Sequence, residues 1–396
     1  METAKKNLTV NYAAMNILYF IAFCSVHAYA VNYLLDKGFS NTEVGVLLAL
    51  ANIISAVSQP IVAQWIDGPG KITNKGVIIF SSMVILVGSL LLRIVSSNKV
   101  SVFIIYALIY MIQFVYQPVM TAICFEYMKA GANIMYGLAR GLGSAGFAVC
   151  SAFLGRAVEN HGVDVILYVN VASMAALVII TLLMKKPSGA EETDDTSATA
   201  EMKQAGGIGH FVKKYPSFML FLIGTICMYF AHNMINDFMI QIIRSLNGAE
   251  TQMGYATSLQ AFLELPMMAC IGILLKRFSA NKLLIFSALF FTIKVAILIF
   301  ATNMAGMYVS QCCQFFAYAL FIPAAAYYVS SNMDENDQVK GQAFITSAIT
   351  LGGVFSNLIC GRILDSFGVS EMILTGTAVS AIGTVIAFMA MRKENN

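Results

Sequence analysis

The sequence predicts an all-α polytopic membrane protein with twelve transmembrane helices in two pseudo-symmetric six-helix bundles. The first observation behind this prediction is the composition, because 58% of the 396 residues are hydrophobic and only 11% are charged. Soluble proteins carry about a quarter charged residues, so this chain could not cover a water-facing surface. The second observation is a series of long apolar stretches, and the third is a repeat that relates the two halves of the chain.

The apolar stretches have the length of transmembrane helices. A helix needs about 20 apolar residues to cross the hydrocarbon core. A membrane β-barrel would instead need alternating strands of about ten residues. Scanning the chain for helical spans gives 11–35, 42–66, 76–95, 100–124, 136–159, 163–184, 216–243, 252–275, 282–301, 304–329, 341–364 and 371–391.

The positions of Lys and Arg predict the orientation. If the N-terminus is inside, most of the 24 Lys and Arg residues fall in segments on the cytoplasmic side, as the positive-inside rule requires. The first apolar segment is too long for a signal peptide and no small-residue cleavage site follows it. We therefore expect a multi-pass protein of the plasma (inner) membrane with both termini in the cytoplasm.

One polar segment divides the chain. Residues 187–214 begin PSGAEETDDTSATAEMKQAGG, which is acidic and poor in large apolar side chains. Such a composition cannot bury a core and is typical of a flexible linker. The sequence thus predicts an N-terminal six-helix bundle over 1–186, a cytoplasmic linker over 187–214 and a C-terminal six-helix bundle over 215–396.

Matching residues recur about 200 positions apart, as a duplication of six spans requires. The fifth span ends with GRAVENHG (155–162) and the eleventh with GRILDSFG (361–368). Two homologous halves of six helices are typical of secondary transporters that alternate access to a site near the midplane.

The chain resembles the major facilitator superfamily in its layout of six spans, a linker and six further spans. The loop after the second span, AQWIDGPGKITNK (63–75), is similar to the glycine-aspartate-basic motif of that superfamily. The resemblance implies a gating role for Asp67, Gly70 and Lys71, and for Arg277 in the second half.

A narrower resemblance begins at the fifth span. MYGLARGLGSAGF (135–147) is similar to a stretch shared by the lactose permease and phenylpropionate permease branch, the oligosaccharide:proton symporters, and KGQAF (340–344) resembles that branch too. The resemblance implies that Arg140 contacts the solute and that Phe147 stands where the permease stacks an aromatic ring on sugar.

Ionisable residues inside the spans are candidates for function, because each costs roughly 2.5–3.5 kcal/mol at a helix centre and needs a partner or a watery cavity. Glu126 and Arg140 flank one short turn. They either close this hairpin as a structural pair, or Glu126 orients the forked donors of Arg140 toward solute oxygens.

Glu264 and Lys294 lie in the neighbouring eighth and ninth spans. They form either a static pair or a proton switch, in which protonation of the carboxylate frees the lysine. We expect Glu264 to carry the proton, with Asp237 in reserve. His232 and Lys294 complete the set that we assign to proton coupling.

The remaining candidates are polar side chains that follow one helix face or stand alone in a span. Tyrosine and glutamine provide uncharged donors, acceptors and ring surface for hydroxylated or aromatic solutes, although interhelical hydrogen bonding would use the same residue types. The expected solute-binding residues of this kind are His27, Tyr110, Gln113, Gln117, Asn233, Asn236, Gln241, Gln311, Gln314 and Tyr318.

Together these observations predict a secondary active transporter for a small hydrophilic organic solute, sugar-like or glycoside-like, with proton symport. A uniporter, an exchanger or an aromatic-acid permease of the same fold are the alternatives. The expected partners are the solute, protons and membrane lipid. A net charge of +3 makes no nucleic-acid-binding patch. We expect no enzymatic activity, cofactor or metal site, and a monomer.

Overall fold

The computed structural model describes residues 2–68, 72–185 and 208–393. Twelve helical segments in these ranges are long and apolar enough to cross a membrane, which confirms the predicted number of spans. Large apolar side chains face outward along them, such as Phe80 at 71% exposure and Phe153 at 73%. Such a surface suits lipid, because a soluble protein rarely exposes large contiguous apolar patches.

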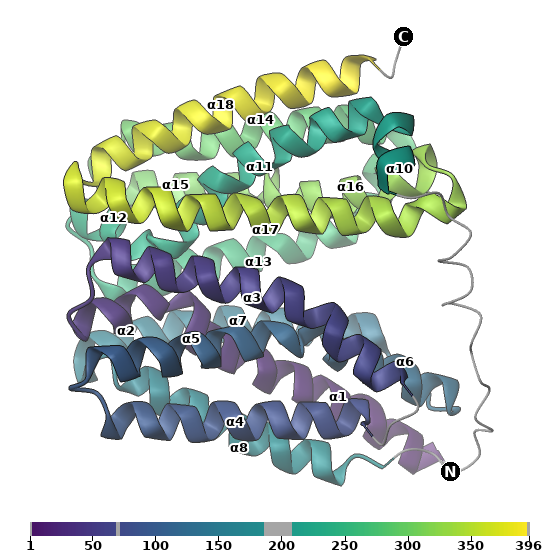
Figure 1. The fold of residues 1–396 in the computed structure, drawn as a ribbon, viewed down its shortest axis with the longest axis vertical. Coiled ribbons are helices and arrows are strands. Elements are labelled where there is room, and N and C mark those ends of the chain that lie inside the picture. Colours follow the sequence, from purple (N-terminus) through teal and green to yellow (C-terminus); the bar gives the residue numbers. More distant parts are fainter. Residues whose placement is uncertain (1, 69–71, 186–207, 394–396) are drawn as a thin grey trace. The chain divides into compact units, whose positions relative to one another are not determined.

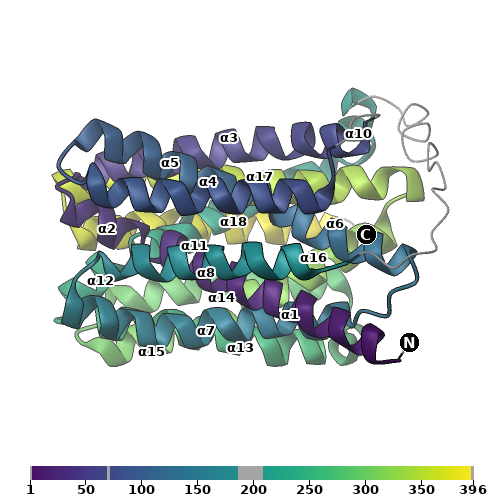
Figure 2. The same cartoon turned by 90° about the horizontal axis from the view of Figure 1, so that it is seen from below.

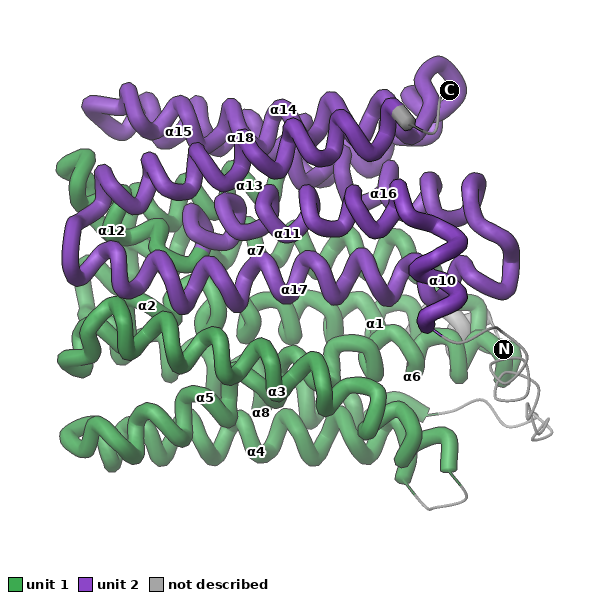
Figure 3. The backbone as a smooth tube through the Cα atoms, turned by 45° about the horizontal axis from the view of Figure 1, so that its top comes forward, with its two compact units in different colours: residues 1–190, 237–262 green, residues 191–236, 263–396 purple. Residues whose placement is uncertain are grey.

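The chain divides into two compact units, shown in green and purple in Figure 3. Unit 1 comprises residues 1–190 and 237–262, and unit 2 comprises residues 191–236 and 263–396. Residues 237–262 therefore belong to unit 1, although the repeat predicts them within the C-terminal bundle. Within each unit the helices lie side by side with nearly parallel axes (Figures 1 and 2).

Unit 1 is built on the first six spans. Its helix α1 packs against α7 and α8, α4 packs against α8, and α3 packs against α5. Its elements are α1 (Glu2–Phe23), the π-helical turn η1 (Cys24–Ala28), α2 (Ala30–Asp36), α3 (Asn41–Asp67), α4 (Asn74–Ile94), α5 (Lys99–Val115), α6 (Gln117–Lys129), α7 (Tyr136–His161), α8 (Val165–Leu183) and α12 (Met239–Ser245).

Unit 2 repeats this arrangement, since α14 packs against α18 as α4 packs against α8. Two helices, α11 and α13, begin in one unit and end in the other. The elements are α10 (Ile208–Lys214), α11 (Pro216–Asp237), α13 (Glu250–Arg277), α14 (Ala280–Ile299), α15 (Met304–Cys312), the 3₁₀ turn η2 (Cys313–Phe315), α16 (Tyr318–Asn332), α17 (Glu335–Ser366) and α18 (Val369–Lys393).

The end of the predicted linker is structured. Residues 187–207 lie outside the described ranges, but residues 208–214 form α10. Phe211 of α10 is fully buried and stacks on Phe344 with ring centroids 5.2 Å apart. The last seven residues of the predicted linker thus form a short helix that is held to the core by an aromatic contact. The flexible linker itself stays a prediction.

Two glycines let residues 250–262 approach α7 within unit 1. A Cβ atom on Gly155 would lie 3.0 Å from the Cα of Gly254, and one on Gly254 would lie 3.2 Å from the Cα of Gly155. Two hydrogen bonds reinforce the contact, from Ser151 Oγ to the Gly254 carbonyl at 3.3 Å and from the Thr251 amide to Glu159 at 3.0 Å. Small residues permit this close helix packing.

Candidate solute-binding site

Four of the twelve spans are interrupted, and they are the first and fourth of each six-span half. The first is broken by the π turn η1, the fourth at Tyr116, the seventh at Phe238, and the tenth by η2. Each of the other eight spans is a single helix. Discontinuous helices and π turns are common at transporter binding sites, because they release backbone groups and redirect side chains.

Side chains from neighbouring helices donate hydrogen bonds to backbone carbonyl groups near these interruptions. In unit 1, the Tyr106 hydroxyl donates to the Val26 carbonyl at 2.7 Å, and the Tyr19 hydroxyl donates to the Gln113 carbonyl at 2.7 Å. In unit 2, Ser287 donates to the Ala317 carbonyl at 2.8 Å. The interruptions are thus stabilised by specific hydrogen bonds, as a low-dielectric interior requires.

In unit 1 the structure surrounds His27 with aromatic rings. The imidazole stacks on Phe23 with ring centroids 4.0 Å apart and planes inclined by 8°. The ring centroids of Tyr110 and Phe114 lie 3.8 Å and 4.4 Å from that of the imidazole. Neither ring nitrogen of His27 has a hydrogen-bond partner among the residues that the structure describes. The sequence left His27 between a structural and a binding role, and its binding role stays a prediction.

Tyr110 and Gln113 extend this cluster along α5. Tyr110 is buried and hydrogen bonds to the side chain of Asn52, and it also interacts electrostatically with Asp237. Gln113 is fully buried, and neither atom of its amide has a partner within the described ranges. Gln117 lies after the interruption, at the first position of α6, and is half-buried.

Glu126 and Arg140 each contact another side chain. Glu126 accepts a hydrogen bond from Asn74 at 2.9 Å, which ties α6 to the start of α4. Arg140 donates to Ser144 at 2.9 Å, and its guanidinium carbon lies 4.2 Å from the centre of the Phe20 ring. Similar depth on neighbouring helices did not specify which way each side chain points.

Phe147 is half-buried in α7 and its ring lies 6.4 Å from that of Phe23, which places it beside the His27 cluster. Gln241 of α12 donates to Asn41 at 2.6 Å, at the start of α3. Both predicted residues thus belong to unit 1, although Gln241 comes from the second half of the sequence.

In unit 2 the structure links Lys294 to Glu264 through a third side chain. Lys294 is 1% exposed, and its ammonium donates to Gln314 Oε1 at 2.8 Å. Gln314 Nε2 in turn donates to Glu264 Oε1 at 3.1 Å. The sequence predicted two charges that neutralise each other as neighbours. Instead an amide bridges them, so the three groups form one hydrogen-bonded chain.

His232 and its neighbours form a second polar cluster in unit 2. The His232 ring stacks on Tyr318 with centroids 5.0 Å apart and planes inclined by 5°. Its Nε2 lies 2.9 Å from Asn236 Nδ2, and its Nδ1 has no partner among the described residues. Asn233 donates to the Tyr229 carbonyl at 2.9 Å. Gln311 is fully buried and its Nε2 lies 3.9 Å from the Met307 sulfur.

The predicted gating residues lie at helix ends. Asp67 is the last residue of α3 and Arg277 is the last residue of α13, and both are exposed. Gly70 and Lys71 lie outside the described residues. The gating role of all four stays a prediction.

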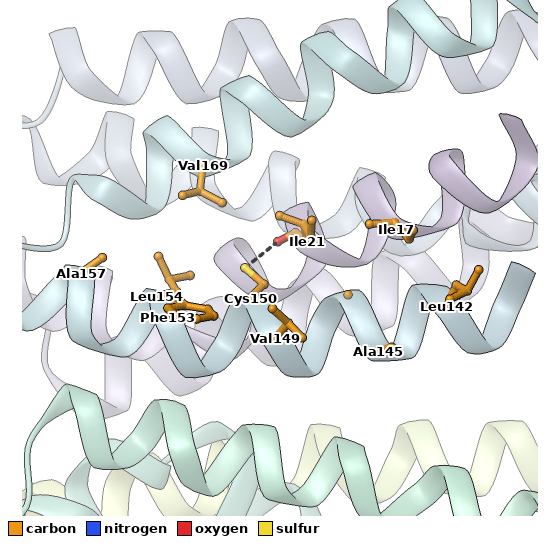
Figure 4. A pocket seen from close by; sticks show the side chains of 11 residues that line it. Ile17, Ile21, Leu142, Ala145, Val149, Cys150, Phe153, Leu154, Ala157 and Val169 are labelled. Atoms are coloured by element: carbon orange, nitrogen blue, oxygen red, sulfur yellow. Dashed lines mark hydrogen bonds between the residues drawn. The ribbon is translucent and has the colours of Figure 1, made fainter. Parts of the chain in front are cut away.

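An apolar groove of about 510 Å³ runs between α1 and α7 (Figure 4). Its only polar contact in Figure 4 joins the Cys150 thiol to the Ile21 carbonyl at 3.9 Å. Such a lining suits acyl chains and not a hydrophilic solute. The lining residues are Ile17, Ile21, Leu142, Ala145, Gly146, Val149, Cys150, Phe153, Leu154, Ala157 and Val169.

The structure adds two amides that the sequence analysis did not single out. Asn32 of α2 and Asn357 of α17 are buried, and their amide atoms have no partner in the described part of the chain. The search for ionisable residues passed over them, since asparagine carries no charge. An amide side chain within an apolar span can nevertheless be used to predict a candidate site residue, because an unpaired polar group there has a high free-energy cost.

Comparisons with known proteins address the fold and the family. No curated protein sequence matches the chain. Among solved structures, the nucleoside transporter NupG is similar with a TM-score of 0.79, at 15% identity over 98% of this chain and 99% of that chain. An auto-inhibited peptide transporter of the POT family is similar with a TM-score of 0.73, at 10% identity over 97% of this chain and 96% of that chain.

A bacterial homologue of the human lysosomal transporter Spinster, inward-facing and unoccupied, is similar with a TM-score of 0.72, at 11% identity over 99% of this chain and 98% of that chain. Identities this low show the shared fold alone. The family model described as the MFS_1 like family matches residues 9–375, which is most of the chain. The chain therefore belongs to the MFS_1 like family of major facilitator superfamily transporters.

Proposed function

We propose that the chain carries a small hydrophilic organic solute with hydroxyl groups on a ring, such as a sugar or a glycoside. The observation that carries this proposal is the set of buried polar side chains without partners in the described part of the chain, above all His27 and Gln113. A buried amide or imidazole without a hydrogen bond is costly. A solute that supplies the missing hydrogen bonds recovers that cost when it binds.

The chemistry of these groups favours an uncharged, hydroxylated solute. Amides and a neutral imidazole both donate and accept hydrogen bonds, as hydroxyl groups do. The rings of Phe23, Tyr110 and Phe114 offer apolar surface for the faces of a sugar or a base. A nucleoside combines both features, and the fold shared with the nucleoside transporter NupG supports including nucleosides among the solutes to be tested.

One observation favours a second candidate, a carboxylate solute such as an aromatic acid. The Arg140 guanidinium contacts Ser144 and the ring of Phe20, and no ion pair of Arg140 occurs among the described residues. A guanidinium presents paired donors that suit a carboxylate. Uptake of phenylpropionate in preference to sugars and nucleosides would support this candidate.

For energy coupling, we propose proton symport through the chain Glu264–Gln314–Lys294. Protonation of Glu264 would remove the charge that Gln314 Nε2 faces and weaken that hydrogen bond. The change would pass to Lys294 through the same amide, because hydrogen-bonded groups polarise one another. A uniporter or an exchanger would not need this response.

The test is uptake into proteoliposomes that contain the purified full chain. Labelled uridine, methyl-β-D-galactoside and phenylpropionate are offered with and without an inward proton gradient. Accumulation of one of the first two above equilibrium, only with the gradient, is the expected result. Accumulation of phenylpropionate alone contradicts the proposed solute class. Equilibration without accumulation under the gradient contradicts proton symport.

We also propose that the chain is a monomer of the plasma (inner) membrane with both termini in the cytoplasm. The Lys and Arg distribution supports this orientation. Protease protection of tags at each terminus, in inside-out and right-side-out vesicles, tests it. Cleavage of both tags only in inside-out vesicles is expected.

A further inference from the structure

His27 lies at an unusual point of the backbone. It belongs to η1, a π-helical turn that ends at Ala28, and the chain resumes as an α-helix only at Ala30. A π turn costs regular hydrogen bonds and commonly marks a functional position. The turn directs an imidazole into the aromatic cluster of Phe23, Tyr110 and Phe114.

Three aromatic rings contact the imidazole of His27. Ring centroids about 4 Å apart require contact through a ring face, and Phe23 at 4.0 Å and Tyr110 at 3.8 Å both meet this condition. Phe114 meets the imidazole in a T-shaped contact, with planes inclined by 80°. The ring nitrogens form hydrogen bonds in the plane of the imidazole, so a solute group would approach them at its edge.

The edge of the imidazole is where its hydrogen bonds are missing. Both Nδ1 and Nε2 are buried without a partner among the described residues. Gln113 lies three residues after Tyr110 on α5, a spacing that places it on the same face of that helix. Its amide oxygen and nitrogen are likewise buried without partners in the described ranges. His27 and Gln113 thus both present unused donors and acceptors.

We infer that His27 is a specificity-determining residue that hydrogen bonds, through the edge of its imidazole, to a hydroxyl group on the ring of the solute. The inference rests on the proposed function and names the solute group that this part of the site recognises. A neutral imidazole has one donor and one acceptor, and a hydroxyl group can pair with either. A carboxylate can pair only with the donor nitrogen.

The test compares hydroxylated solutes with their deoxy analogues. Wild-type chain in proteoliposomes takes up labelled uridine or methyl-β-D-galactoside, and each single deoxy analogue of that solute is used as competitor. We expect one deoxy position at which the wild type binds about 3- to 10-fold more weakly, as the loss of one hydrogen bond implies. The variant His27→Phe keeps an aromatic ring at this position. In this variant the weaker binding of that one deoxy analogue should disappear, while the affinities of the other deoxy analogues should not change.

Two further variants keep the result interpretable. His27→Gln retains a donor and an acceptor and should restore part of the preference, even if His27→Phe folds poorly. Phe114→Leu removes ring contact without changing hydrogen bonds and should weaken every competitor to a similar degree.

An unchanged deoxy preference in His27→Phe would overturn the inference while leaving the proposed function intact. Uniform weakening of all competitors would also overturn it, because that pattern indicates a packing role. If neither uridine nor methyl-β-D-galactoside is taken up by the wild type, the proposed solute class fails and this inference fails with it.

Discussion

Gln113 in unit 1 and Gln314 in unit 2 occupy corresponding places in the fourth span of each half, yet their surroundings differ. Gln113 is fully buried and has no side-chain partner among the described residues. Gln314 is equally buried, but its amide accepts from Lys294 and donates to Glu264. The duplicated scaffold supplies the position of the glutamine. The charged side chains on neighbouring helices determine whether its amide already forms hydrogen bonds within the protein.

The difference concerns the glutamine position and not the whole unit, because unit 2 also holds unpartnered polar atoms among the described residues, such as His232 Nδ1. At this position, unit 1 presents an unused donor and acceptor, which suits solute binding. Unit 2 has a hydrogen-bonded chain from a carboxylate to an ammonium there, which suits a response to protons. Changes at Gln314, Gly352, Gly146, Glu264 and Gln113 test how the two units differ.

The largest effect is expected for Gln314→Leu. Leucine cannot accept from Lys294, so a buried ammonium would lose the hydrogen-bond acceptor that the structure gives it. Breaking a buried charged interaction costs about 3–5 kcal/mol, and we expect a loss near the lower limit. Thermal unfolding of the chain in detergent measures it. Gln314→Glu, which can still accept from Lys294, is the matched control, and equal stability of Gln314→Leu and wild type would contradict the role of the bridge.

A smaller effect is expected where corresponding helices pack. A Cβ atom on Gly352 of unit 2 would lie 2.8 Å from the Ile226 carbonyl oxygen and 3.0 Å from the Phe230 amide nitrogen. On Gly146 of unit 1 it would meet the Ile17 side chain at 3.1 Å. Because side chains shift more easily than backbone, Gly352→Ala should cost about 2 kcal/mol and Gly146→Ala under about 1 kcal/mol. Thermal unfolding compares them, and the reverse order would show looser packing in unit 2.

The substitution Glu264→Gln should abolish accumulation of the solute but should leave solute exchange intact. A gradient of one pH unit can drive about tenfold accumulation with one proton per solute, and this factor should fall to about one. Solute counterflow, which needs no proton gradient, should persist. Asp237→Asn is the comparison within unit 1. If accumulation survives in the double variant Glu264→Gln/Asp237→Asn, neither carboxylate carries the proton.

The substitution Gln113→Leu should reduce transport without reducing the stability of the chain. Removal of a polar group that lacks a partner leaves stability unchanged or raises it by up to about 1 kcal/mol. Uptake should nevertheless fall about 3- to 10-fold, because the solute loses a hydrogen bond. Thermal unfolding and uptake are measured on the same preparation. A marked loss of stability would instead indicate a structural role for Gln113.

The smallest effect concerns Lys214, at the end of α10. Its hydrogen bonds to Asp334 and Asp337 hold the pKa of the Lys214 ammonium above its usual value. A raised lysine pKa stabilises the fold fully below the unfolded-state pKa of about 10.4, and this contribution is lost only at higher pH. The difference in melting temperature between wild type and Lys214→Met should therefore be small and constant from about pH 6 to pH 9. A change across this range would require another titrating group.

The spans were predictable because hydropathy is a property of consecutive residues. All twelve appear within seven residues of their predicted ends, including the polar fourth span around Gln113. The family was predictable too, since the two halves retain matching glycines. The narrower resemblance to the lactose and phenylpropionate permease branch stays a prediction.

The partners of the polar side chains were not predictable. Glu126 accepts from Asn74, Arg140 donates to Ser144, and Gln314 stands between Glu264 and Lys294. A partner depends on the rotation of each helix about its axis and on the side chains that neighbouring helices present. Neither quantity can be read from a single stretch of sequence.

The sequence by itself determined that this chain resides in a membrane, how often it crosses, and that it is a duplicated six-helix unit. These properties follow from the lengths of apolar stretches and from repeated residues. Only the tertiary structure decided where the first and fourth helices of each half break, and which buried polar groups are already paired. The physical reason is that backbone interruptions and buried hydrogen bonds are satisfied by groups from distant parts of the chain, which meet only when the helices pack.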